Sequence, residues 1–145
     1  MVKVLIKKLD PSVKLPIYKT SGSSGMDLMA FLKDPVNVKV NTSSIIPTGL
    51  SIACSENYEI QIRPRSGLAA KNNIGVLNSP GTIDSDYRGE IKVIIFNHGN
   101  KDFIVNNGDR IAQMVIAPIE KMELEETKSL PETIRGEGGF GSTGK

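Results

Sequence analysis

The sequence predicts an all-β domain with a jelly-roll-like barrel or sandwich fold, one short helix and a flexible C-terminal arm. Two observations predict this class. Apolar and polar residues alternate at 36–40 (VNVKV) and 58–63 (YEIQIR), with the period of two that half-buried strands require. Glycine, proline, asparagine and aspartate interrupt the apolar pieces at short intervals, as in IPTGL, NSPGT and VNNGDR, so the strands should be short and joined by turns.

Three later segments do not show this alternation of apolar and polar residues. SGLAAKNN at 66–73 is the one segment that favours a helix, of about two turns, because Ser66 can serve as N-cap before good helix formers. Two dense apolar runs, IKVIIF at 91–96 and RIAQMVIAPI at 110–119, predict strands that are buried on both faces.

The end of the chain is polar and then rich in glycine. Residues 120–135 contain few apolar side chains, and Pro131 interrupts any regular structure, so they should form a surface connection. Five of the last eleven residues are glycine, which resists being fixed in one conformation. We therefore expect a single β domain over residues 1–134 and a mobile glycine-rich lid over residues 135–145.

Composition limits the possible partners. A chain of 145 residues with 39% apolar and 23% charged residues fits one ordinary globular domain. Its net charge of +2 comes with scattered lysines, so no basic face for nucleic acid is expected. The start, MVKVLIKKLD, lacks the apolar region of a secretory signal, and no apolar stretch is long enough to cross a membrane. We expect a cytoplasmic protein without a membrane partner.

The sequence contains too few cysteines and histidines for several types of site. Cys54 is the single cysteine and His98 the single histidine, so a disulfide, a zinc site or a Ser-His-Asp triad is not expected. We expect Cys54 to be a small apolar residue at a strand end, and His98 to be a solvated turn residue.

Three segments between the predicted strands allow both a structural and a chemical interpretation. In PRSGLAAK (64–71), the helix start with Arg65 and Ser66 could bind an anion or could be an ordinary cap. In NSPGTIDSDYRGE (78–90), at the foot of an expected hairpin, Asp84 or Asp86 could bond to the backbone or take a proton from an attacking water. In GDRIAQ (108–113), Asp109 and Arg110 could pair in a turn, with Gln113 on a partly exposed face.

The tail RGEGGFGSTGK (135–145) is the fourth such segment. It could be a frayed terminus, or a lid that holds a phosphate through its glycine N–H groups while Phe140 covers an aromatic base. A match to G-x-G-x-x-G at 136–141 does not indicate a dinucleotide site, because only four residues follow Gly141 and no helix can open there.

SGMDLMA (24–30) and these four segments resemble the five motifs of one family, and they occur in the same order. The whole chain resembles this family, the trimeric deoxyuridine triphosphate nucleotidohydrolases (dUTPases). Small departures are Met26 and Ser24 in the first motif. The resemblance implies hydrolysis of dUTP to dUMP and pyrophosphate, which keeps uracil out of DNA and supplies dUMP for dTMP synthesis. It further implies that Asp84 is the general base that activates water for attack on the α-phosphorus.

The resemblance also implies roles for the other motif residues. Tyr87 would pack under the deoxyribose and Asn78 would help to read uracil, while Asp27 would support the metal and phosphate region through water or a neighbouring arginine. Mg²⁺ would be held by phosphates and waters without a direct protein ligand. Phosphate contacts are expected from Arg65, Ser66, Gly67 and Gln113.

The tail and the assembly follow from the same resemblance. Phe140 would stack on uracil, and the γ-phosphate would be held by Arg135, Gly141, Ser142 and Thr143. The lid should be disordered without nucleotide, because ordering costs on the order of 1 kcal/mol per residue. Family members are homotrimers whose active sites combine motifs from three subunits, so a homotrimer is expected.

Two rival functions predict different sequences. A deoxycytidine triphosphate deaminase, similar in fold, would need a longer chain and a catalytic Glu in the pocket. A non-catalytic jelly roll that binds nucleotide or protein would be expected to lack Asp84 or the tail, and both are present.

Overall fold

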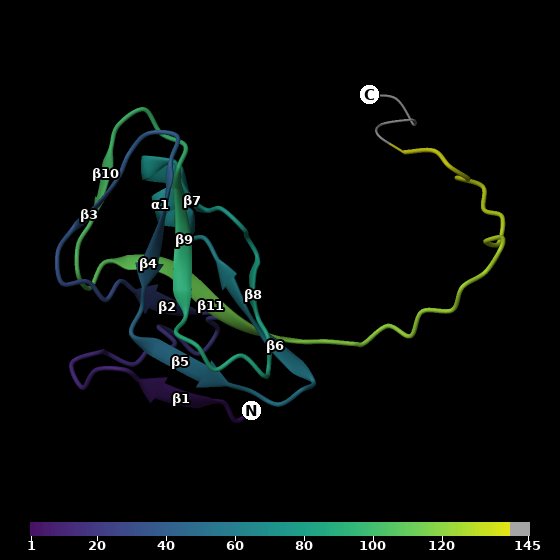
Figure 1. Ribbon diagram of the computed structural model, residues 1–145, viewed down its shortest axis with the longest axis horizontal. Coiled ribbons are helices and arrows are strands. Elements are labelled where there is room, and N and C mark those ends of the chain that lie inside the picture. The colour runs from purple at the N-terminus through teal and green to yellow at the C-terminus, as the bar shows by residue number, and fades with distance from the viewer. Residues whose placement is uncertain (140–145) are drawn as a thin grey trace.

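The computed structural model describes residues 1–139. Within this range the chain forms short strands and a single helix, labelled in Figure 1. The strands and the helix are β1 (Leu5–Lys8), β2 (Met26–Met29), β3 (Val36–Val38), β4 (Ser43–Pro47), β5 (Leu50–Ala53), β6 (Tyr58–Arg63), α1 (Ser66–Asn72), β7 (Ile74–Val76), β8 (Gly81–Ile83), β9 (Lys92–Asn97), β10 (Phe103–Val105) and β11 (Arg110–Pro118).

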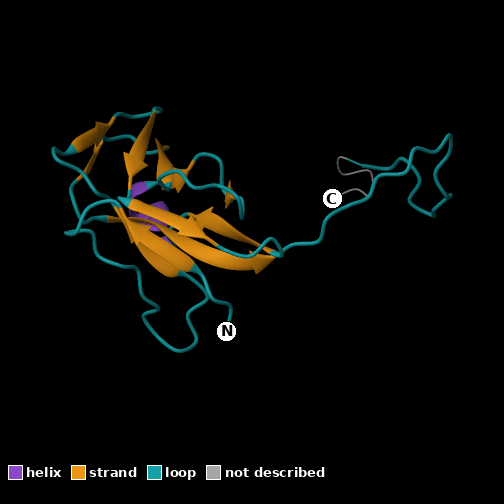
Figure 2. Ribbon diagram, turned by 60° about the horizontal axis from the view of Figure 1, so that its bottom comes forward, coloured by secondary structure: helices purple, strands orange, loops and turns teal. Residues whose placement is uncertain are grey.

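All strand pairs are antiparallel. The largest sheet has the order β2-β11-β6-β8, and a second sheet has the order β4-β9-β7. Two further pairs, β1 with β5 and β3 with β10, complete the described fold. The sheets do not close on themselves, so the predicted all-β jelly-roll class is confirmed as an open sandwich rather than a barrel (Figures 1 and 2).

One apolar core joins the two larger sheets. Leu28 on β2 and Ile111 on β11 face Ile46, Ile74 and Ile95 from the second sheet, and the side chains of all five are almost completely buried. Burial of a side chain of this size stabilises the folded state by about 1.5–3 kcal/mol. This core fixes the sheet that carries the site described below.

The predicted strands occur, but their burial differs from the prediction. The strand predicted at 58–63 is β6, whereas the one predicted at 36–40 is shortened to β3. The expectation that the apolar runs 91–96 and 110–119 are buried on both faces is wrong. On β9, Val93 and Ile95 are buried while Ile94 and Phe96 are only half-buried, because the outer face of an open sandwich has no second layer over it.

The helix forms where the sequence predicts it, at Ser66–Asn72, but Ser66 is not its N-cap. Arg65 occupies the cap position in an extended conformation, and no side chain bonds to the free N–H groups there. At the other end, Asn73 adopts a left-handed conformation with φ 55° and donates its N–H to carbonyls of the last turn. The helix start is therefore open to solvent.

After β11 the chain leaves the folded body. Ile119 still donates its N–H to the Asn57 carbonyl at 3.0 Å, and residues 120–139 then run outward without helix or strand (Figures 1 and 2). This agrees with the predicted surface connection. Met122, Leu124, Leu130 and Ile134 are more than 80% exposed along it. Within the described chain, no helix has the length and apolar character that crossing a membrane requires.

Candidate functional site

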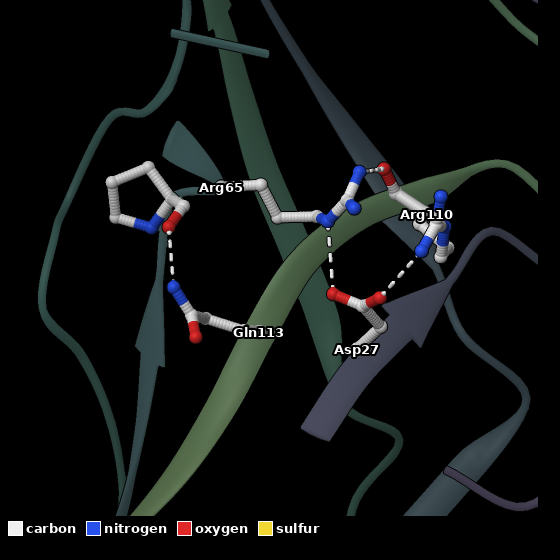
Figure 3. A network of polar contacts seen from close by, with 5 residues as sticks. Asp27, Arg65, Arg110 and Gln113 are labelled. Carbon is white, nitrogen blue, oxygen red and sulfur yellow. Dashed lines mark hydrogen bonds and ion pairs between the residues drawn. The ribbon is translucent and has the colours of Figure 1, made fainter. Parts of the chain in front are cut away.

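Asp27 is held between two arginines. Nε of Arg65 donates to Oδ1 of Asp27 at 2.9 Å, and Nη1 of Arg110 donates to Oδ2 at 3.1 Å (Figure 3). Arg65 also donates from Nη1 to the Arg110 carbonyl at 3.2 Å. The Asp27 and Arg65 side chains are only 19% and 23% exposed, whereas that of Arg110 is 51% exposed. Two guanidiniums against one carboxylate leave a net positive charge that faces solvent.

Strand β11 brings these residues together because it pairs with both β2 and β6. Gln113 on β11 lies opposite Asp27 on one side and opposite Arg63 on the other. Arg65 follows Arg63 by two residues. The cluster therefore combines side chains from the segments 24–30, 64–71 and 108–113, which are far apart in the sequence.

A β-bulge between Arg110 and Ala112 turns Arg110 toward Asp27. Regular pairing from Gln113 opposite Asp27 would place Arg110 opposite Ala30, on the other face of the sheet. The bulge instead places Arg110 opposite Met29, which shares the face of Asp27. The consecutive burial of Ile111 and Ala112 is the trace of this extra residue.

Gln113 is positioned by a hydrogen bond and by a glycine. Its Nε2 donates to the Pro64 carbonyl at 3.0 Å, which fixes the turn before Arg65 (Figure 3). A Cβ atom at position 25 would lie 2.8 Å from Oε1 of Gln113 and 3.2 Å from the Met114 carbonyl. Glycine at position 25 therefore leaves the space that the Gln113 side chain occupies.

The start of α1 adjoins this cluster. Ser66 and Gly67, both predicted phosphate contacts, are exposed there. Apart from the adjacent residues and the backbone of the helix itself, nothing lies within 4 Å of the position of a Cβ at Gly67. The alternative that Asp109 and Arg110 pair with each other is not the one found. Asp109 instead accepts the backbone N–H of Asn106 at 2.8 Å, which frees Arg110 for Asp27.

Asp84 and Tyr87 lie in the turn that follows β8. The turn is closed by the Tyr87 N–H, which donates to the Asp84 carbonyl at 3.1 Å. Both residues are exposed. The prediction of a hairpin here is wrong, because β8 pairs with β6, whereas β7 and β9, its neighbours in the sequence, pair with each other in the second sheet. Asn78 lies beside β8, where its amide comes within 3.2 Å of the position of a Cβ at Gly81.

The Asp84 turn and the Asp27 cluster lie at opposite edges of one sheet. Asp27 is on β2, and β8 is three strand spacings away, so the two edges are separated by about 14 Å across the sheet. Asp27 is level with Arg63 and Ile83 is level with Ile60, which adds about 10 Å along the strands. Within one chain the two groups of residues do not meet.

Of the predicted tail residues, only Arg135 is described. Its Nε donates to the Gly138 carbonyl at 2.7 Å, and the Gly138 N–H donates back to the Arg135 carbonyl at 3.1 Å. Arg135 belongs to the segment 120–139, which leaves the folded body after β11 (Figure 1). The predictions for Phe140, Gly141, Ser142 and Thr143 and for the order of the lid lie outside the described residues.

Residues 1–139 contain no group of three or more His, Cys, Asp or Glu side chains arranged to hold a metal ion. Asp27 is the carboxylate nearest to the arginine pair, and both of its oxygens already accept hydrogen bonds. A cation at this place would therefore need most of its oxygen ligands from a bound phosphate and from water.

Comparison with known proteins identifies close relatives. The dUTPase family model matches residues 12–144. The deoxyuridine 5'-triphosphate nucleotidohydrolase of Rickettsia prowazekii is 57% identical over 145 residues, which cover 99% of this chain and 98% of the relative.

Solved structures show the same fold. The dUTPase of Staphylococcus bacteriophage 80alpha, solved with dUPNHPP, gives a TM-score of 0.88 at 23% identity and covers 99% of both chains. A mutant dUTPase from phage phi11 of S. aureus, described with a structural Mg(II) ion, gives a TM-score of 0.79 at 20% identity over 90% of this chain and 99% of that one.

Proposed function

Because this chain belongs to the dUTPase family, we propose that Asp84 is the general base of its reaction and that the arginine cluster at Asp27 binds the phosphates. The protein is a hydrolase that converts dUTP to dUMP and pyrophosphate. The observation that carries the assignment of the phosphate-binding residues is the convergence of Asp27, Arg65, Arg110 and Gln113 from three distant segments.

Asp84 is suited to take a proton from water. Its carboxylate is exposed directly after β8, and it has no side-chain hydrogen bond or ion pair to another residue of the described chain. Asp27, by contrast, has both oxygens engaged by arginines. An ionised carboxylate within hydrogen-bond reach of a water can accept its proton as the water attacks phosphorus.

The positive cluster suits a triphosphate. Arg65 and Arg110 share a single carboxylate, so about one unit of positive charge remains for the substrate, and guanidinium groups bind phosphate oxygens through two N–H donors. Ser66 and Gly67 supply a hydroxyl and backbone N–H groups beside Arg65, and Gln113 supplies an amide. Asp27 acts by orienting both guanidiniums.

Mg²⁺ would bind together with the substrate, and the residues around Asp27 fit this arrangement. Phosphate oxygens would hold it, with Asp27 reached through water, because the Asp27 oxygens are already occupied by arginines. The ion would offset part of the phosphate charge when bound. The residues of the chain bind and orient the phosphates whether or not the ion is bound.

The base and sugar are read by the turn beside β8 and by the tail. Asn78 would pair with the uracil edge, and Tyr87 would pack under the deoxyribose, where a 2′-hydroxyl would not fit. A pocket that pairs with uracil rejects cytosine because the wrong edge leaves buried donors or acceptors unpaired. Phe140 would stack on the uracil, with Arg135, Gly141, Ser142 and Thr143 on the γ-phosphate.

The complete site would be assembled from several copies of the chain in a homotrimer. The separation of Asp84 from the Asp27 cluster supports this, because one nucleotide would contact both groups most simply if they came from different chains. The outward course of residues 120–139, the segment that includes Arg135, also supports it, since the segment extends away from its own folded body (Figure 2).

A substrate panel tests the function. The protein is incubated with Mg²⁺ and dUTP, dCTP, dTTP or UTP, and both pyrophosphate and ammonia are measured. We expect pyrophosphate from dUTP and little from the other three nucleotides. Ammonia from dCTP would indicate a deaminase, and no product from any nucleotide would indicate a binding protein.

A further inference from the structure

The phenol ring of Tyr87 is folded over Gly89. A Cβ atom at position 89 would lie 2.5 Å from Cζ of Tyr87 and 3.0 Å from its Cε2, and closer still to the hydroxyl oxygen. Carbon atoms in proteins essentially never approach so closely. The ring can occupy its position only because residue 89 has no side chain.

Backbone conformation does not explain the glycine. Gly89 is not among the glycines with positive φ in the described chain, which are Gly49, Gly108 and Gly136. An alanine could therefore adopt the same backbone at position 89. The space that the Tyr87 ring needs is the remaining requirement for glycine there.

The Tyr87 hydroxyl is tied to a fixed carbonyl. It donates to the Glu90 carbonyl at 3.1 Å. Oε1 of Glu90 accepts the Gly49 N–H at 2.8 Å, and the next residue, Ile91, donates its N–H to the Leu50 carbonyl at 2.8 Å. Thr48 donates its hydroxyl to the Ile91 carbonyl at 2.7 Å. These contacts attach the end of the Tyr87 turn to the connection between β4 and β5.

We propose that Gly89 and Glu90 are positioning residues that fix the Tyr87 ring, and that Gly89 thereby sets the discrimination between dUTP and UTP. This inference rests on the proposed role of Tyr87 at the sugar. A ring beneath the deoxyribose excludes a 2′-hydroxyl only if it cannot tilt away. The gap over Gly89 and the hydrogen bond to Glu90 hold it in one orientation.

The first test is Gly89→Ala. The added methyl group displaces the ring, which is the end of a side chain, rather than the backbone. We expect the ratio of kcat/KM for dUTP to kcat/KM for UTP to fall about tenfold. The melting temperature should change by less than about 2 °C. Gly22→Ala is the matched control, because nothing beyond the two adjacent residues lies within 4 Å of a Cβ there, and both quantities should stay unchanged.

A second pair of variants tests Glu90. Glu90→Ala removes the acceptor of the Gly49 N–H and should lower the dUTP-to-UTP ratio, whereas Glu90→Gln keeps an oxygen at that place and should restore it. Equal ratios for Glu90→Ala and wild type would contradict the role of Glu90. This pair also tests the inference if the Gly89 variant folds poorly.

Tyr87→Ala separates this inference from the proposed function. An unchanged dUTP-to-UTP ratio in Tyr87→Ala would overturn the role of Tyr87 itself. A lowered ratio in Tyr87→Ala together with a wild-type ratio in Gly89→Ala would overturn only the positioning role of Gly89. In the double variant, the alanine at position 89 should have no further effect, because it acts through the ring that is already absent.

Discussion

Nη1 of Arg110 lies 3.1 Å from Oδ2 of Asp27, although 83 residues separate them in the chain. The same carboxylate binds Nε of Arg65 at 2.9 Å. Two cations close to each other would repel without the shared anion, so Asp27 keeps both guanidiniums in fixed orientations.

Asp27→Asn should weaken the fold moderately. The variant removes the charge that both arginines share, and we expect the free energy of unfolding to fall by about 1 kcal/mol, since Arg110 is half exposed and its contact is partly screened. Urea unfolding measures the change. Asp34→Asn is the control, because Asp34 is exposed and has no side-chain partner within residues 1–139. Equal losses in both variants would mean that the arginine contacts contribute nothing.

Asp84→Asn should keep nucleotide binding and lose turnover. Asparagine has the same shape but cannot accept a proton from water, so we expect kcat to fall at least about 100-fold. Calorimetry with dUpNHpp should give an affinity close to that of the wild type. Asp86→Asn is the matched control two residues away, and it should retain kcat. The reverse result would assign the base to Asp86.

Gly25→Ala should disturb Gln113. The new Cβ would lie 2.8 Å from Oε1 of Gln113 and 3.2 Å from the Met114 carbonyl, so both the amide and strand β11 must move. We expect a loss of about 1–3 kcal/mol in unfolding free energy, as for other overpacked positions, and a lower kcat. Thermal unfolding and steady-state kinetics check these two results. An unaltered melting temperature would show that this spacing is not required.

Mixing two inactive variants tests whether the sites are shared. Asp84→Asn and Arg65→Ala should each be inactive alone. If Asp84 and Arg65 of one site come from different chains, random co-assembly should restore about a quarter of wild-type activity, because a quarter of the sites receive both intact residues. The two chains are unfolded together, refolded and assayed with dUTP. If both residues come from the same chain, the mixture will stay inactive.

Removal of residues 135–145 should reduce catalysis far more than stability. The last strand ends at Pro118 and no core residue follows it in the described chain, so the melting temperature should remain within about 2 °C of the wild type. Turnover of dUTP should fall strongly because the lid is absent. Full activity in the shortened protein would refute the lid.

The all-β class, strand 58–63 and the position of the helix were predictable because each depends on a local pattern. The pairing of strands was not. Turn residues around Asp84 indicate a reversal of the chain, but they do not specify that β8 pairs with β6 rather than with its neighbours in sequence. Long-range pairing is decided by the packing of both sheets on one core.

The candidate site was predictable only in part, and for a similar reason. Asp27, Arg65 and Gln113 followed from the resemblance, whereas for Arg110 the sequence suggested at most a pairing in a turn with Asp109, its immediate neighbour. Its true partner depends on the β-bulge, which is visible only in the register of β11 against β2. The bulge leaves Ile111 and Ala112 buried next to each other. In the sequence, however, these two adjacent apolar residues look like part of a uniformly apolar run and do not indicate a bulge.

The bulge at Arg110 makes chain length a requirement that substitutions alone do not reveal. Deleting Ile111 would restore regular pairing with Arg110 still opposite Met29, so the arginine would keep the face of Asp27 while a buried isoleucine of the core was lost. An inserted residue between Arg110 and Ala112 would instead move the arginine opposite Ala30, on the other face of the sheet from Asp27. Homologous chains can therefore exchange side chains in this stretch, but a gain of one residue would detach the cation from its carboxylate, and a loss would remove part of the core.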